Sequence, residues 1–194
     1  ADVVQSTAIS IKMIFLYFGR WWLRYPDGSY PANERVVRDG VTYSFDANGW
    51  MKTGWQIEDG VWHYYAPSGA MATGWTAVGG TWYYLDPNTG AMATGRLKDG
   101  DTWYYLHGSG AMATGWVNLS GAWFYLNGNG SMATGWVKLG GTWYYLTESG
   151  QMAIGWVKDG GSWYFCHPSG AMATGRVVIG GTAYTFDGSG RWVA

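Results

Sequence analysis

Aromatic side chains recur through this chain at a spacing that suits the binding of an organic cation. The chain has 194 residues, among them 15 Trp and 15 Tyr. In the stretch GWVKLGGTWYYLTESGQMA, Trp136 and Trp143 are followed by Tyr144, Tyr145 and Met152. Indole and phenol rings hold quaternary ammonium groups through their ring quadrupoles, and methionine adapts to fill the remaining apolar wall. This combination predicts a cage for such a cation, and it requires no carboxylate.

The pattern returns about every twenty residues, which organises the whole chain. The methionines recur in phase at Met51, Met71, Met92, Met112, Met132, Met152 and Met172. A fixed period of this length is typical of repeat proteins. Each copy has two short β-rich runs around a glycine turn and no helical periodicity, which predicts a β-hairpin. Because one hairpin is marginally stable alone, we expect an all-β solenoid in which each hairpin packs its aromatic face on its neighbours.

Composition and charge exclude several classes of function. The net charge is −1 and the chain has no Lys/Arg run, so we expect no nucleic-acid partner and no binding to an anionic membrane surface. The apolar segment from Ile9 to Phe18 contains Lys12 and is too short to span a bilayer, so we expect no membrane insertion. Ala1 is interpreted as the start of a processed or trimmed secreted chain.

The residues that could catalyse a reaction have simpler interpretations, and we expect no enzyme, metal site or cofactor. Cys166 occupies a position that is Leu in other copies, which predicts a buried free thiol. His167 is its neighbour in sequence, and adjacent side chains on a strand face opposite ways, so the two make a poor nucleophile and base pair. Four acidic residues that precede glycines are interpreted as turn residues: Asp39, Asp59, Asp99 and Asp159.

Alternation along a strand separates the rings of one copy. In Trp-Tyr-Tyr, the Trp and the second Tyr share a face while the first Tyr points the other way. A junction between two hairpins can therefore form a recess with three aromatic walls. We expect the second tyrosines to lie in the core, namely Tyr65, Tyr84, Tyr105, Tyr125 and Tyr145.

These motifs carry a family resemblance. GWVKLGGTWYYLTESGQMAIGW resembles the choline-binding repeats of pneumococcal surface proteins, autolysins and phage lysins, and RWWLRYPDGSYP resembles the opening hairpin of an autolytic amidase's choline-binding region. The resemblance covers residues 19–194 and leaves 1–18 as a lead segment or a degenerate first repeat. It implies a left-handed superhelical solenoid that binds phosphocholine of teichoic and lipoteichoic acids and so holds a secreted protein on the bacterial cell wall surface.

The resemblance also implies the site residues. Each cage takes both tryptophans of one repeat, the first Tyr of the next and the Met that follows. The five sets are Trp55, Trp62, Tyr83 and Met92; Trp75, Trp82, Tyr104 and Met112; Trp116, Trp123, Tyr144 and Met152; Trp136, Trp143, Tyr164 and Met172; and Trp156, Trp163 and Tyr184 with Trp192 in the Met position.

Other junctions depart from this pattern. Arg96 replaces a tryptophan beside Trp103, Phe124 and Met132, and its guanidinium is expected to repel a cationic ligand, leaving that site weak or empty. The junction before Trp55 is altered by Arg35, Thr42 and His63, and the last one by Arg176 and Ala183. Near the N-terminus, a degenerate cage is expected from Phe15, Trp22, Tyr43 and Met51.

Three other functions stay open at this point. The chain could be a glucan-binding array, because aromatic-rich repeats of glucan-binding streptococcal proteins and clostridial toxins are similar, although the cage positions hold few polar groups. It could be an adhesin that binds a host protein through residues 1–18 or the variable turns. It could also be the anchoring part of a larger hydrolase.

Overall fold

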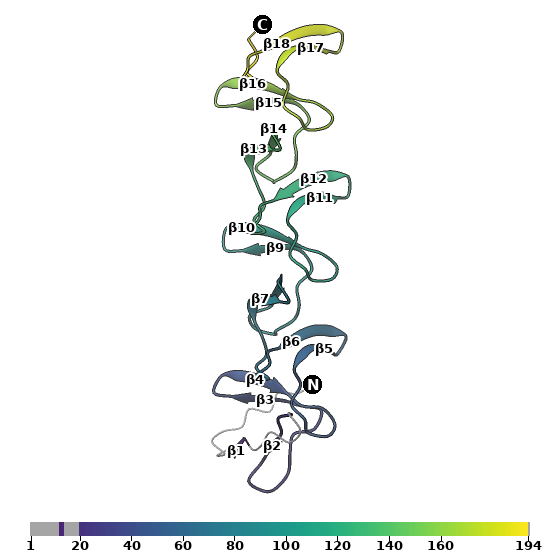
Figure 1. Ribbon diagram of the computed structural model, residues 1–194, viewed down its shortest axis with the longest axis vertical. Coiled ribbons are helices and arrows are strands. Elements are labelled where there is room, and N and C mark those ends of the chain that lie inside the picture. Colours follow the sequence, from purple (N-terminus) through teal and green to yellow (C-terminus); the bar gives the residue numbers. More distant parts are fainter. Residues whose placement is uncertain (1–11, 14–19, 194) are drawn as a thin grey trace. The chain divides into compact units, whose positions relative to one another are not determined.

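The computed structural model describes residues 12–13 and 20–193, and these form β-hairpins joined by loops (Figure 1). The strands are β1 (Lys12–Met13), β2 (Leu23–Arg24), β3 (Arg35–Arg38), β4 (Val41–Ser44), β5 (Gly54–Glu58), β6 (Val61–Tyr65), β7 (Gly74–Val78), β8 (Thr81–Leu85), β9 (Gly95–Asp99), β10 (Thr102–Leu106), β11 (Gly115–Leu119), β12 (Ala122–Leu126), β13 (Gly135–Leu139), β14 (Thr142–Leu146), β15 (Gly155–Asp159), β16 (Ser162–Cys166), β17 (Gly175–Ile179) and β18 (Thr182–Phe186). Successive strands pair into two-stranded sheets, and the described residues contain no helix. Among them, therefore, no helix is long and apolar enough to cross a membrane.

Two-residue turns with positive φ close the hairpins. In the β13–β14 hairpin, Gly140 and Gly141 have φ of 55° and 88°. Such turns match the right-handed twist of the paired strands and favour Gly, Asn or Asp. Asp39 and Asp59 adopt the same conformation, with φ of 50° and 54°, which confirms their assignment to turns. Asp99 and Asp159 do not fit that prediction, because they are the last residues of β9 and β15, and Asp159 pairs with Ser162 across its hairpin.

One position per hairpin supplies the core. It is the last residue of the second strand, and its side chain is almost completely buried in Tyr65, Leu85, Leu106, Leu126, Leu146, Cys166 and Phe186. The sequence prediction for the second tyrosines is right for Tyr65, which is 0% exposed. It is wrong for the other four, which are half-buried: Tyr84, Tyr105, Tyr125 and Tyr145. Tyr65 occupies the core position itself, whereas the others lie one residue earlier, on the face that carries the tryptophans.

Main-chain hydrogen bonds connect one repeat to another through the methionines. The Met92 N–H donates to the Trp62 carbonyl at 2.8 Å, and the Met172 N–H donates to the Trp143 carbonyl at 2.8 Å. The Met92 side chain then lies under the turn at Gly110, where an added Cβ would be only 2.3 Å from the Met92 sulfur. Gly110 has φ of +81°, so both space and conformation call for glycine there.

The hairpins belong to two compact units. One comprises Ala1–Gly95 with Leu106–Ala111, and the other Arg96–Tyr105 with Met112–Ala194. The first also contains a small core of Leu23, Val36, Phe45 and Met51. The boundary expected between residues 18 and 19 lies outside the described residues, as does Phe15.

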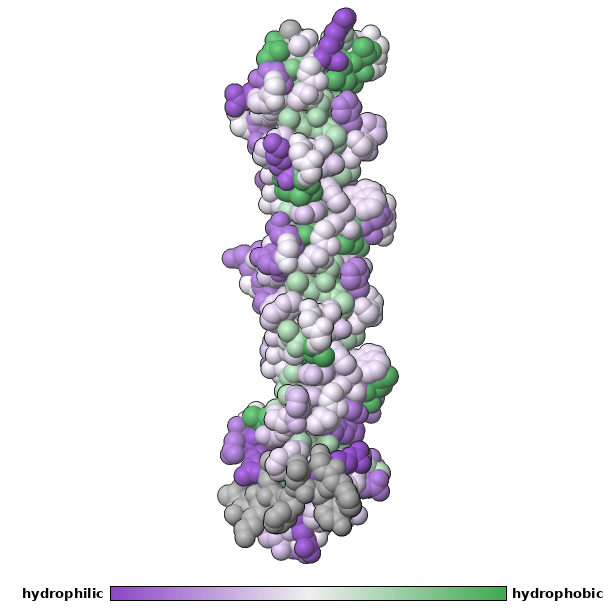
Figure 2. All heavy atoms as spheres, in the orientation of Figure 1, coloured by the Kyte–Doolittle hydropathy of each residue, from purple (hydrophilic) through white to green (hydrophobic). Residues whose placement is uncertain are grey.

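The surface carries few strongly hydrophobic groups on the face seen in Figure 2. Residues of near-neutral hydropathy cover most of this face, and the strongly hydrophobic ones form small separate groups. Several tryptophans are nevertheless well exposed, with 46% of Trp82 and 43% of Trp123 open to solvent. Such exposed indoles are available to a ligand.

Candidate functional site: aromatic cages between hairpins

The first set of rings surrounds a recess. In this β5–β6 cage, Trp55 lies with its ring centroid 6.3 Å from that of Trp62 at an interplanar angle of 87°, and 4.7 Å from that of Tyr83. These three residues and Met92 line a cavity of about 340 Å³, together with Gly108 and Ser109. The structure therefore brings the whole predicted set together around one open space.

The β11–β12 cage repeats this geometry in the second unit. The rings of Trp116 and Trp123 are 6.4 Å apart at 88°, and those of Trp116 and Tyr144 are 5.0 Å apart. The Met152 N–H donates to the Trp123 carbonyl at 2.7 Å, which places the methionine beside the second tryptophan. An ammonium cage requires ring faces, which carry the negative side of the quadrupole, and rings at right angles can turn their faces toward one shared space.

The β13–β14 cage has a carboxylate next to it. Trp136 lies 4.8 Å from Tyr164 between ring centroids, and Met172 is bonded to the carbonyl of Trp143. The Trp136 Nε1–H donates a hydrogen bond of 3.1 Å to the Asp159 carboxylate. Burial raises the pKa of Tyr145, and the negative charge of Asp159 raises it further. The sequence interpretation of Asp159 as a turn residue missed this contact, although its spacing from Trp136 equals that of Glu58 from Arg35.

The β15–β16 cage is enclosed by four rings. Trp156 lies 6.3 Å from Trp163, 5.0 Å from Tyr184 and 6.0 Å from Trp192 between centroids. Tyr184 and Trp192 are also 6.0 Å apart. The Trp192 N–H donates to the Trp163 carbonyl at 2.8 Å, the same bond that the methionines make elsewhere. Trp192 therefore fills the methionine position with a further aromatic wall.

The β7–β8 set remains a prediction from the sequence. Trp75 and Trp82 lie on β7 and β8 of the first unit, whereas Tyr104 and Met112 belong to the second. Within the first unit, the Trp75 ring packs against Tyr84, with centroids 5.2 Å apart.

Arg96 occupies the junction where the sequence predicts a weak or empty site. Its guanidinium carbon is 4.7 Å from the Trp103 ring centroid and 5.7 Å from that of Phe124. The Met132 N–H still donates to the Trp103 carbonyl, at 2.7 Å. The junction thus keeps its backbone and two of its rings, and its own cation contacts the faces that a ligand would use.

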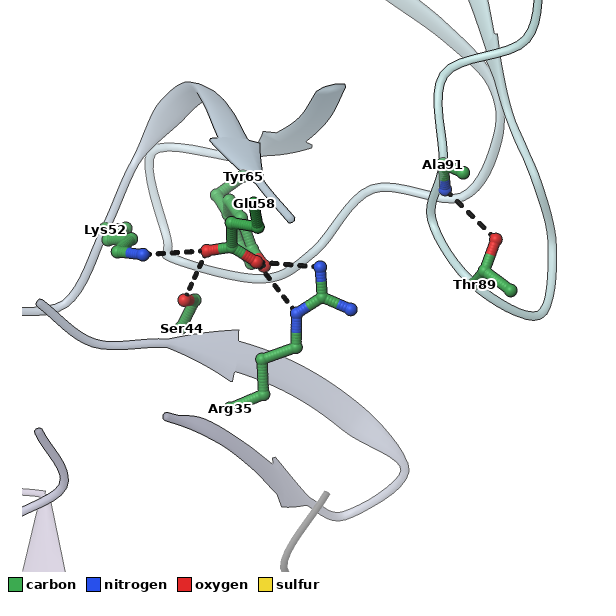
Figure 3. Close-up of polar contacts among 7 residues, drawn as sticks. All are labelled: Arg35, Ser44, Lys52, Glu58, Tyr65, Thr89 and Ala91. Atoms are coloured by element: carbon green, nitrogen blue, oxygen red, sulfur yellow. Dashed lines mark hydrogen bonds and ion pairs between the residues drawn. The ribbon is translucent and has the colours of Figure 1, made fainter. Parts of the chain in front are cut away.

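The junction between β3–β4 and β5–β6 contains an ionic network in place of the cage tryptophans (Figure 3). The Glu58 carboxylate accepts hydrogen bonds from Ser44, Tyr65, Lys52 and Arg35, and the Arg35 ion pair measures 2.7 Å. Burial by itself raises the pKa of this carboxyl, but the four donors outweigh it and lower the pKa of Glu58 to about 2. Arg35 stands in a tryptophan position, so this network replaces a cage with a charged seam.

His63 is buried in the first-tyrosine position of the same junction. Only 4% of it is exposed, and its Nδ1 has no hydrogen-bond partner among the described residues. Burial lowers the pKa of His63, and the positive charge of Arg35 lowers it further. The main-chain bond between repeats is nevertheless kept at this junction, because the Met71 N–H donates to the Thr42 carbonyl at 2.8 Å.

The potential nucleophile and the N-terminal set have structural roles. Cys166 is free and buried, as predicted, and burial raises the pKa of its thiol to about 11. Of the degenerate N-terminal cage, Met51 and Tyr43 pack in or against the small core, and Trp22 packs on Tyr30 with centroids 5.6 Å apart. A cavity of about 370 Å³ lies nearby, but of these three residues only Met51 borders it. The described residues of the predicted N-terminal cage therefore do not surround a common space.

Comparisons with known proteins agree with this architecture. A family model described as choline-binding repeat matches residues 32–73, 52–97, 72–115 and 113–155, and a cell wall binding repeat model matches residues 154–172. No curated protein sequence gives a match. The chain belongs to the choline-binding repeat family.

Solved structures from Streptococcus pneumoniae share the fold. CbpJ is 36% identical with a TM-score of 0.82, and the match covers 90% of this chain and 70% of CbpJ. Choline binding protein F, solved with a peptidoglycan analogue, is 43% identical with a TM-score of 0.73, over 78% of this chain and 55% of that one. The modular autolysin LytC is 33% identical with a TM-score of 0.70, over 94% of this chain and 42% of LytC. The expected class, an all-β solenoid of hairpins, is confirmed, and the chain spans only part of these relatives.

Proposed function

We propose that this chain attaches non-covalently to the bacterial cell wall by holding phosphocholine of teichoic and lipoteichoic acids in its aromatic cages. The observation that carries the proposal is the β5–β6 recess of about 340 Å³, walled by Trp55, Trp62, Tyr83 and Met92. A space of this size, with apolar and aromatic walls, suits a trimethylammonium group, which has no hydrogen-bond donors and needs ring faces and apolar contact. The protein's place would be outside the cell, on the wall.

Each cage is expected to bind weakly. Three ring contacts of about 0.5–2 kcal/mol each correspond to a dissociation constant near the millimolar range. Wall polymers carry many choline groups, so several cages on one chain raise the overall affinity by roughly a hundredfold or more through effective concentration. Weak single sites are therefore compatible with firm attachment.

We propose that this part of the chain binds and does not catalyse. The groups that a reaction would need already have other partners or surroundings. The Glu58 carboxylate accepts hydrogen bonds from four donors, the Asp159 carboxylate accepts the Trp136 N–H, and the Cys166 thiol is buried with a raised pKa. A catalytic domain elsewhere in a longer protein is compatible with this role, as LytC is a modular autolysin.

A choline titration followed by tryptophan fluorescence tests the proposal. We expect a saturable change at millimolar choline that glucose oligomers do not produce and that Trp136→Ala reduces. Trp103→Ala is the matched control, because Trp103 is 39% exposed and lies in the Arg96 junction, where a weak or empty site is expected. A response to glucose oligomers without one to choline would show a sugar-stacking surface. Capture of a host protein that survives excess choline would show that adhesion uses another surface.

A further inference from the structure

The β13–β14 cage differs from the others in the charged groups that touch its walls. The Lys138 ammonium is 5.7 Å from the ring centroid of Trp143. The Arg191 guanidinium interacts with the Tyr164 hydroxyl, and this interaction is the main cause of a raised pKa for Arg191. Two basic groups therefore contact two different walls of one cage.

The strand register explains the position of Lys138. Lys138 pairs directly with Trp143 across the hairpin, so the two side chains share the face that carries the cage. In the β5–β6 hairpin the equivalent partner of the second tryptophan is Ile57, and in β7–β8 it is Ala77. The β15–β16 hairpin has Lys158, at the same 5.7 Å from Trp163.

Arg191 departs from the repeat at the position that directly precedes the methionine. It directly precedes Trp192, and the residue before the methionine in other copies is a small or uncharged side chain: Ala70, Ala91, Ala111, Ser131, Gln151 and Ala171. Arg191 is exposed to solvent. Its interaction with Tyr164 thus places a positive charge beside this cage, with the Asp187 carboxylate also nearby.

The charges around this cage suit a ligand that has both signs. Two cations next to a cation-binding cage disfavour choline alone, because like charges repel. Asp159, bonded to the Trp136 N–H, supplies a negative charge that favours an ammonium in the cage. A phosphate joined to that ammonium would carry the charge opposite to that of the cations beside Trp143 and Tyr164.

We infer that the β13–β14 cage selects phosphocholine over choline, and that Lys138 and Arg191 hold the phosphate while the rings hold the ammonium. This inference rests on the proposed function and assigns the phosphate contacts within it. Lysine and arginine are the usual partners of phosphate oxygens, arginine through a fork of donors.

The indole N–H signal of Trp136 gives a reporter for this single cage. Its hydrogen bond to Asp159 gives the proton a distinct environment, and Trp136→Phe assigns the signal in a nitrogen–proton correlation spectrum of the whole chain. Choline and phosphocholine are titrated separately. The variant is Lys138→Ile with Arg191→Ala, which installs the residues that other copies have. The control is Lys98→Ile, which removes a lysine at the same repeat position from the hairpin of Arg96.

The expected result is roughly fivefold tighter binding of phosphocholine than of choline at this cage, since each exposed charge pair contributes a factor of about two to three. The double variant should lose this preference, because it binds phosphocholine more weakly and choline slightly more tightly once the two cations are gone. The Lys98→Ile control should retain the preference, and 1 M salt should reduce it. Equal affinities in the parent chain, or a preference unchanged in the double variant, would overturn the inference. A signal that choline does not move would instead overturn the proposed function.

Discussion

Replacing Arg96 with tryptophan should create a binding site that the chain now lacks. In the native junction the guanidinium contacts the rings of Trp103 and Phe124 at 4.7 and 5.7 Å. Exposed contacts of this kind stabilise by about 0.5–1 kcal/mol each, so a ligand that displaces Arg96 loses about 1–2 kcal/mol, roughly tenfold or more in affinity. Charge repulsion weakens it further. Arg96→Trp removes both penalties and completes a set of three rings with Met132.

Equilibrium dialysis at saturating choline measures this change directly. The Arg96→Trp variant is expected to bind one more choline per chain than the parent, with a millimolar dissociation constant like those expected for the other cages. Arg176→Trp is the matched control, because its hairpin has Ala183 in place of the second tryptophan and should gain nothing. An unchanged stoichiometry in a folded Arg96→Trp chain would refute the view that the guanidinium blocks an otherwise intact site.

Three further changes test the seams between repeats. Glu58→Gln should lower stability at pH 7 by about 3 kcal/mol, from a carboxyl pKa lowered from its usual 4.5 to about 2. A lowered carboxyl pKa stabilises the folded state above pH 4.5, and this stabilisation is lost as the pH falls toward 2. The stabilities of parent and variant, measured by hydrogen exchange of β3 to β6, should therefore converge near pH 2, and a constant difference at all pH values would contradict this. The lowered pKa of His63 means that protonation opposes folding, so His63→Phe should remove the stability loss between pH 7 and 5, measured by urea unfolding. Gly110→Ala should displace Met92, destabilise by about 1–2 kcal/mol and weaken choline binding, whereas Gly108→Ala, with open space around it, should leave the stability unchanged.

Periodicity made most of this architecture predictable. Once neighbouring hairpins are known to stack, the repeated spacing is enough to predict which rings lie together. The structure places the predicted residues around Trp55, Trp116, Trp136 and Trp156 close to one another. The core position was harder to predict, because Tyr65 and the second tyrosines of the other copies look alike in sequence but differ by one residue in register. A shift of one residue exchanges the two faces of a strand.

Contacts specific to one junction could not be obtained from the repeat. The sequence predicts that Arg96 repels a cation, but not that its guanidinium lies on Trp103. The sequence did not single out Glu58 as a site residue, because its partners come from three other strands and a loop and do not recur in other copies. The contact between Asp159 and Trp136 escaped prediction for the same reason, since a turn role explained the acidic residue equally well.

The bond that joins the repeats has a consequence for how such proteins diverge. It runs from one main-chain N–H to one main-chain carbonyl, and it forms with Thr42 in a tryptophan position and with Trp192 in a methionine position. The bond between repeats is therefore insensitive to the identity of the side chains at the proposed cage positions. A single base change can silence or convert one cage while the register of its neighbours is preserved, so the number of working sites can drift between relatives whose backbones stay the same.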